Sequence, residues 1–262
     1  MLEITTYTSL SGSRLTGNNI SAAGQTQAVA TDDKAGATTS TSSTGTSSTV
    51  SNLARQLGEA AARAEARDAS LSRKELGQKA AAIVDQIVGD SYTAQKAKHD
   101  AEVPNTNDPT LLARAQQATD FVNGKASNPF GGMSRDQLAL IAYDESGTFT
   151  VNERRAAWQE AYDQEEAWRQ KVVAKATDEY NRTGKLTNFF SEVLEYYKGL
   201  PAIEQAQYPE NYAADLQQKI DLDFNYMTHR AEGKGSSPTS LIEQLVAAGP
   251  YTKKDSSKTE VD

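Results

Sequence analysis

The sequence predicts an all-α fold, and two patterns carry that prediction. Apolar residues recur at intervals of three and four in one segment after another, which is the spacing of one face of a helix. No stretch of useful length alternates apolar and polar residues, as a half-buried strand would. Clusters of Gly, Pro and Ser separate the helical segments and act as start or stop signals. Together these patterns favour a helical, bundle-like domain.

The distribution of aromatic residues predicts where the core lies. Seventeen of the nineteen aromatic residues lie from Phe121 onward, and only Tyr7 and Tyr92 precede it. Aromatic side chains supply much of the area that a core buries, so we expect the packed domain to span residues 108–250. The remaining segments are predicted to be a disordered Ser/Thr-rich N-terminal segment (1–48), a helical pair or stalk (49–92), a polar linker (93–107) and a polar tail (251–262).

The N-terminal part of the chain divides into a polar segment and two helices. Of the first 50 residues, 21 are Ser or Thr, so the segment cannot bury enough apolar area to offset the entropy of ordering its backbone. Residues 50–67 are predicted to form a helix with a thin, alanine-rich apolar stripe. A second helix over 70–89 has a stronger stripe, made of Leu76, Ala80, Ile83, Val84, Ile87 and Val88.

The main domain is expected to consist of helices over residues 109–124, 134–143, 152–182, 186–198, 208–227 and 239–248. Pro109 occupies the first turn of the first of these helices, where its missing N–H costs nothing. Ser134 and Gln137 have the spacing of a capping box, and Gly184 ends the long helix. In that helix Trp158 and Trp168 share an apolar stripe, so we expect them to be core anchors.

The corner at residues 142–153 is the one place where the sequence suggests specific chemistry. If Gly147 is the sixth of twelve loop residues, Asp144 is third, Ser146 fifth and Glu153 twelfth. This order resembles a degenerate EF-hand over residues 134–158, in which Ala142 occupies the first place, where the family has an aspartate. The resemblance implies a weak calcium or structural loop, with these candidate ligands: Asp144, Ser146, Thr148, Thr150 and Glu153.

Two other interpretations of this corner remain open. A rival register begins at Asp144 and uses alternate residues up to Asn152, but it puts Arg155 where the glutamate belongs. In a purely structural corner, Asp144 and Ser146 cap backbone amides and Gly147 makes the turn. EF-hands usually occur in pairs, but the stretch at 221–232 that has some of the required residues reads better as continuous helix.

Composition excludes several classes of function. The net charge is −8, so nucleic acid is not an expected partner, because binding phosphates requires a basic surface. The absence of cysteine excludes disulfides, thiolate metal sites and cysteine nucleophiles. No apolar run reaches the roughly 18 residues of a membrane span, and the mixed charge of the helices makes a membrane surface an unexpected partner. No familiar catalytic motif occurs, and His99 and His229 are expected to be an exposed linker residue and a helix-end residue.

The composition of the N-terminal segment suggests a secretion signal. Its Ser/Thr-rich, charge-poor composition, with Ile4 near the start, resembles the secretion signals of bacterial type III effectors, although Glu3 departs from that pattern. No Sec-type signal is visible, so we expect secretion by a non-Sec route or, failing that, a cytoplasmic protein. The predicted function is therefore a non-enzymatic, effector-like bacterial protein that binds a protein partner. The alternatives are a calcium-responsive EF-hand-like module and an enzyme whose carboxylate chemistry is not visible in sequence.

Overall fold

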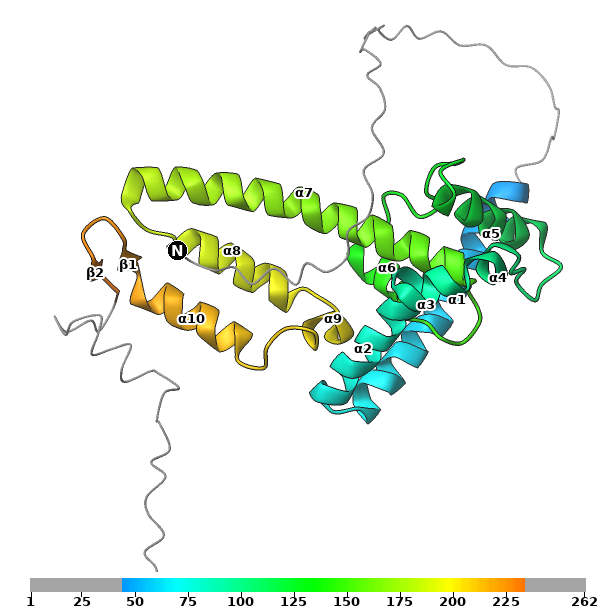
Figure 1. The fold of residues 1–262 in the computed structure, drawn as a ribbon, viewed down its shortest axis with the longest axis horizontal. Coiled ribbons are helices and arrows are strands. Elements are labelled where there is room, and N and C mark those ends of the chain that lie inside the picture. Colours follow the sequence, from blue (N-terminus) through cyan, green and yellow to red (C-terminus); the bar gives the residue numbers. More distant parts are fainter. Residues whose placement is uncertain (1–43, 234–262) are drawn as a thin grey trace, which may run out of the picture.

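The computed structural model describes residues 44–233 and confirms the all-α fold (Figure 1). Most of the predicted disordered segment, the predicted helix at 239–248 and the polar tail lie outside these residues. None of the helices in the described range combines the length and apolarity that a membrane crossing requires. The elements are α1 (Thr44–Ser70), α2 (Arg73–Val88), α3 (Asp90–Ala94), α4 (Lys96–Asp100), α5 (Pro109–Val122), α6 (Arg135–Ala142), α7 (Val151–Thr183), α8 (Thr187–Lys198), α9 (Ala202–Gln205), α10 (Tyr212–Leu222), β1 (Phe224–Asn225) and β2 (Arg230–Ala231).

A globular half is built around the first turns of α7. Helices α5 and α6 pack on α7, while α1 lies on α6 and α2 reaches both α7 and α9. The residues buried in this core come from every one of these helices and from the loops beside them: Ala60, Leu76, Ala80, Ile83, Ala118, Phe130, Leu138, Ile141, Phe149, Ala156, Ala157 and Ile203.

The helical pair at 49–92 is therefore part of the main core and not a separate stalk. Ala60, Leu76 and Ile83 belong to the same buried cluster as Phe130 and Phe149. The predicted start of the packed domain at residue 108 is wrong, because it was inferred from the aromatic residues after Phe121 alone. The small alanine and aliphatic side chains of α1 and α2 fit closely against these aromatic side chains.

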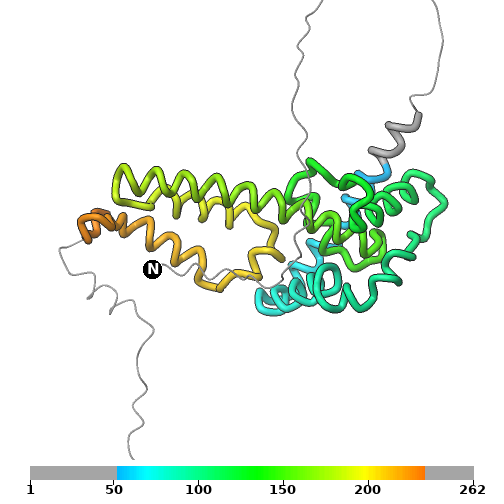
Figure 2. Tube along the Cα trace, turned by 45° about the horizontal axis from the view of Figure 1, so that its top comes forward, coloured from blue at the N-terminus to red at the C-terminus, as the bar shows by residue number. Residues whose placement is uncertain are grey.

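The second half of the structure is a helical arm, which we define as α7 from Tyr162 onward, α8, α10 and the β1–β2 hairpin. Each helix of the arm runs antiparallel to the one before it, and together the helices project away from the globular half (Figures 1 and 2). Helix α8 packs against both α7 and α10. The apolar cluster of the arm contains three buried residues, Phe190, Leu194 and Leu216, and only Val172 and Tyr197 are buried apolar residues of its helices besides these, so its core is small.

A half-buried arginine joins the two halves. Arg135, in the first turn of α6, donates to Glu204 of α9 (2.8 Å), to the Ala161 carbonyl (2.8 Å) and to Glu165 of α7 (3.2 Å). Burial opposes the charge of this side chain, but the carboxylates of Glu204 and Glu165 outweigh that effect and raise the pKa of Arg135. The junction is thus held by charge-assisted hydrogen bonds across three helices.

The residues predicted to begin or end helices mostly do so in the structure. Ser134 and Gln137 form a capping box, Pro109 lies at the start of α5, and Gly184 ends α7 with a φ of 72°. The helix predicted over 208–227 is wrong at both ends: α10 begins at Tyr212 and stops at Leu222. Asp223 then adopts a left-handed conformation, and a two-stranded hairpin replaces the rest of the predicted helix.

Candidate functional site: the 142–153 corner

The EF-hand-like corner connects α6 to α7 by a tight turn. Helix α6 ends at Ala142, Gly147 has a φ of 82°, and Thr150 is the N-cap of α7. Phe149 is 2 % exposed and packs inward, as the loop pattern requires. The corner therefore has the helix–loop–helix outline that the sequence predicts. Whether it suits a metal ion depends on the partners of its side-chain oxygen atoms.

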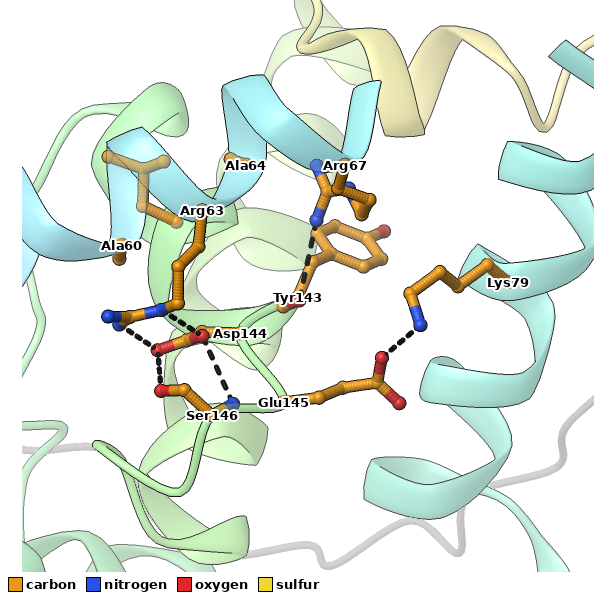
Figure 3. A pocket seen from close by; sticks show the side chains of 10 residues that line it. Ala60, Arg63, Ala64, Arg67, Lys79, Tyr143, Asp144, Glu145 and Ser146 are labelled. Atoms are coloured by element: carbon orange, nitrogen blue, oxygen red, sulfur yellow. Dashed lines mark hydrogen bonds and ion pairs between the residues drawn. The ribbon is translucent and has the colours of Figure 1, made fainter. Parts of the chain in front are cut away.

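Asp144 is paired with an arginine of α1 (Figure 3). Arg63 donates from Nε to one carboxylate oxygen (3.0 Å) and from Nη2 to the other (2.7 Å). The backbone N–H and the hydroxyl of Ser146 donate to the same carboxylate at 3.2 and 2.8 Å. Burial alone would raise the pKa of Asp144, but the hydrogen bonds from Arg63 and Ser146 outweigh it, so the pKa lies below its ordinary value.

Arg63 also donates to the hydroxyl of Thr148, at 3.3 Å. The hydroxyls of Ser146 and Thr148 are 2.8 Å apart and hydrogen-bonded to each other. One guanidinium therefore gathers Asp144 and Thr148, with Ser146 bridging them, on the side of the loop that faces α1. In this conformation Arg63 supplies the positive charge that a bound cation would otherwise bring.

Glu153 is paired with a different arginine, Arg114. Its side chain is buried, and one oxygen accepts from Nε of Arg114 on α5 at 2.7 Å. The other oxygen accepts from the backbone N–H of Thr150 (2.8 Å) and from its hydroxyl (3.0 Å), which completes a capping box for α7. The Arg114 guanidinium also lies against the rings of Phe130 and Phe149, at 5.7 and 5.3 Å from their centroids.

The five candidate ligands thus fall into two groups. Asp144, Ser146 and Thr148 surround Arg63, whereas Thr150 and Glu153 form a cap that Arg114 neutralises. Both carboxylates are already engaged, so the side chains as arranged do not fit a calcium ion. Residues 44–233 also contain no cluster of three or more His, Asp or Glu side chains suited to a metal. Calcium binding stays a prediction, and it requires at least Arg63 to move aside.

The rival register and the second candidate loop use residues that have other partners. Asn152 is buried, and its amide nitrogen donates to the His99 carbonyl and to Asp100 and Thr119. Arg155 lies over the Tyr92 ring, 4.2 Å from its centroid. In the hairpin, Asp223 and Glu232 both pair with Lys185, at 2.6 and 2.7 Å.

His99 is buried, which corrects the expectation that it is an exposed linker residue. It is 8 % exposed and its ring stacks on Tyr92 at a centroid distance of 5.2 Å. The hydroxyl of Tyr92 donates to Asn152 at 2.8 Å. Burial lowers the pKa of His99 below its ordinary value, because the charged ring loses hydration. His229 lies in the hairpin turn with a φ of 56°, and not at a helix end.

A recess of about 180 Å³ lies between α1, α2 and the corner (Figure 3). Its charged groups pair with one another: Arg63 with Asp144, and Lys79 with Glu145. Arg67 pairs with Asp68 and donates to the Tyr143 carbonyl at 3.4 Å. A second recess of about 230 Å³ lies beside Gly147 and Thr148, near Arg55 and Arg114. We assign no reaction to either.

Sequence reasoning missed the arginines that surround the corner. Arg63 and Arg67 lie one turn apart on a helix that is otherwise rich in alanine, which was the available signal. Arg154 is 6 % exposed, its Nε donates to the Ala142 carbonyl, and its Nη2 has no hydrogen-bond partner in the structure. Burial lowers the pKa of Arg154.

Comparison with protein-family models, with curated proteins and with solved structures found no match for this chain.

Proposed function

We propose that this chain is a non-enzymatic, effector-like bacterial protein that acts by binding a helix of a protein partner on its helical arm. The observation that supports this is the distribution of exposed apolar side chains. Among the described residues, the exposed large apolar side chains are those of Val103, Tyr162, Val173, Tyr180 and Met227. All but the first of these lie on the arm, whose own core is small. Exposed apolar groups that gather on one element are typical of an interaction surface.

Three of these side chains lie along one side of α7, and we call them the apolar face: Tyr162, Val173 and Tyr180. Intervals of eleven and seven residues bring a helix back to nearly the same side after three and two turns. A second amphipathic helix could pack on such a stripe if it placed polar groups opposite Glu166 and Arg169, which lie on the same side of α7 between Tyr162 and Val173. The stripe extends over about 27 Å, at 1.5 Å per residue.

The apolar face lies on the α10 side of α7. The Tyr180 ring contacts the Tyr226 ring of the hairpin that follows α10, with centroids 6.4 Å apart. Lys175, which lies about 200° round the helix from Val173, pairs instead with Glu192 of α8 at 2.8 Å. A partner helix would therefore approach between α7 and α10.

Site-specific photocross-linking tests this proposal. A photoreactive residue at Val173 is compared with one at Lys171, which is also exposed but lies about 200° round α7. We expect cross-links to one protein from Val173 only, at an amphipathic helical segment of that protein. Purified partner should bind the wild-type chain at least tenfold more tightly than Val173→Asp. Equal cross-linking from both positions, or equal affinity of the variant, would contradict the proposal.

A second function, a calcium-responsive corner, is favoured by the way loop oxygens converge on Arg63. Asp144 and Thr148 already contact one cationic group. Calorimetric titration of the full chain with calcium tests the idea. Arg63→Ala should bind calcium at least tenfold more tightly than the wild type, and Asp144→Asn or Glu153→Gln should remove the heat. Equal affinity of the wild type and Arg63→Ala would refute the competition.

A further inference from the structure

We propose that the recess between α1, α2 and the corner binds a small organic carboxylate (Figure 3). Arg67 and Lys79 hold the carboxylate group of this ligand, and apolar side chains of the recess hold a short alkyl chain. The site lies in the globular half of the structure, so it does not depend on the partner that we propose for the arm.

The recess collects positive charge on a chain whose net charge is −8. Three of its lining side chains are cationic, Arg63, Arg67 and Lys79, and two are anionic, Asp144 and Glu145. Arg63 donates to both oxygens of Asp144 and neutralises that carboxylate. The recess is therefore a local exception to the overall charge, and Arg67 and Lys79 are its cations on the side away from Asp144.

Arg67 has a donor group that is poorly used. Its Nε and Nη2 both contact one oxygen of Asp68 at 2.8 Å, outside the lining of the recess. Its Nη1 donates to the Tyr143 carbonyl at 3.4 Å, which is longer than the roughly 2.7–3.2 Å of an ordinary N–H···O hydrogen bond. The Arg67 side chain is only 14 % exposed, so its position is fixed by packing. An anion in the recess would accept a stronger hydrogen bond from Nη1.

A carboxylate of the chain itself already contacts Lys79. Glu145 extends from the corner toward the Lys79 ammonium group (Figure 3), and within residues 44–233 its carboxylate makes no other hydrogen bond or ion pair. Lys79 has three N–H donors, so this one contact leaves donors free. Both side chains are partly exposed, and exposed pairs stabilise a fold little. A ligand carboxylate can therefore replace Glu145, whose side chain then turns into solvent.

The rest of the lining suits a short alkyl chain. Ala60, Ala64 and Leu140 contribute apolar surface to the recess. Its volume of about 180 Å³ is comparable to the roughly 150 Å³ of an engineered cavity that holds benzene, so a ligand of about six non-hydrogen atoms fits. Ligand pockets typically combine apolar surface with a few polar groups that fix the orientation of the ligand. Butyrate has this size and both chemical parts.

Titration of the ¹⁵N-labelled full chain with butyrate, at pH 7 and constant ionic strength, tests the proposal by NMR chemical shifts. We expect saturable binding at one site, with the largest shifts at amides that line the recess. Acetate should bind about tenfold more weakly, because it lacks two CH₂ groups that butyrate buries. Butylammonium, which has the opposite charge, should not bind. No saturable binding of butyrate, equal affinity of acetate, or binding of butylammonium would overturn the proposal, as would tighter binding of inorganic phosphate than of butyrate.

Two variants that break the same ion pair should have opposite effects on binding. Lys79→Gln removes a charged contact to the ligand and should weaken butyrate binding about tenfold. Glu145→Gln removes the competing carboxylate and should strengthen binding about twofold or more. A general effect on folding would instead change the affinity in the same direction in both variants.

Lys74→Gln is the matched control, because Lys74 is an exposed residue of the same helix outside the recess. It should leave the affinity for butyrate unchanged. Changes of the same direction in Lys79→Gln and Glu145→Gln, or equal weakening by Lys74→Gln and Lys79→Gln, would overturn the assignment of this recess.

Discussion

Replacing Arg114 by Met tests whether the corner is held by buried charge pairs. The Arg114 and Glu153 side chains are 13 % and 1 % exposed, and their hydrogen bond is 2.7 Å long. Arg114→Met keeps most of the aliphatic volume but leaves the Glu153 carboxylate buried without its cation. Breaking a buried pair in this way costs about 3–5 kcal/mol. We therefore expect the free energy of unfolding to fall by that amount.

The assay is urea unfolding followed by the fluorescence of the two tryptophans. With an m-value of about 2 kcal/mol/M, the midpoint should shift by about 1.5–2.5 M. Arg55→Met is the matched control, because Arg55 and Glu59 form an exposed pair, and such pairs contribute at most about 1 kcal/mol.

A double-mutant cycle separates the pair from other contacts of the arginine. Arg114 also donates to Gln56 at 2.9 Å, so the single variant loses more than one interaction. Adding Glu153→Gln removes the unpaired charge, and the double variant should recover about 1–3 kcal/mol relative to Arg114→Met alone. A loss below about 1 kcal/mol for Arg114→Met, or strict additivity in the cycle, would refute the reasoning.

Three further predictions concern other parts of the chain. Gly184→Ala should cost more stability than Gly147→Ala in urea unfolding: both have a positive φ, which costs a non-glycine residue about 1–2 kcal/mol, but a Cβ at Gly184 would also lie 2.5 Å from the Asn225 side chain. Because burial lowers the folded-state pKa of His99, the unfolded chain binds the proton more readily. Stability should therefore fall as pH drops below about 6.5, down to the folded pKa, and His99→Phe should remove this part of the pH dependence in melting curves at pH 4–7. Residues 1–50 fused to a reporter should be exported by bacteria with an active type III apparatus and retained when the apparatus is disabled; export that is independent of the apparatus would exclude this route.

The sequence predicted the longer helices well because their signals are local, but it missed the short helices α3, α4 and α9. Capping boxes, a Pro at a first turn and a Gly at a helix end act within a few residues, so Ser134, Pro109 and Gly184 could be assigned from neighbouring positions. The hairpin after α10 could not, because it is held by residues distant in sequence. Lys185 pairs with both Asp223 and Glu232, and the Gly184 carbonyl accepts from Tyr226.

The corner shows the same division between local and distant information. Its outline follows from Gly147, Phe149 and Thr150, and the sequence predicted it. The partners of its two carboxylates did not follow, since Arg63 precedes Asp144 by 81 residues and Arg114 precedes Glu153 by 39. His99 was placed wrongly for a similar reason. Its polar neighbours in sequence suggested a linker, whereas Tyr92 and Asn152 enclose it in space.

The arginines beside the corner and the alanine at its first loop position together determine the charge around its carboxylates. Ala142 is 1 % exposed and its carbonyl accepts from Arg154, so its side-chain position is buried apolar space. The two carboxylates among the candidate ligands, Asp144 and Glu153, each have one guanidinium partner, so each has a counter-charge without a metal. A divalent ion entering this corner would have to displace an arginine and lose a charge-assisted pair for each carboxylate that it takes. Any affinity of the loop for calcium would therefore depend on α1 and α5 as much as on the loop residues. For that reason Arg63→Ala is a more informative variant for the calcium question than any substitution within the loop.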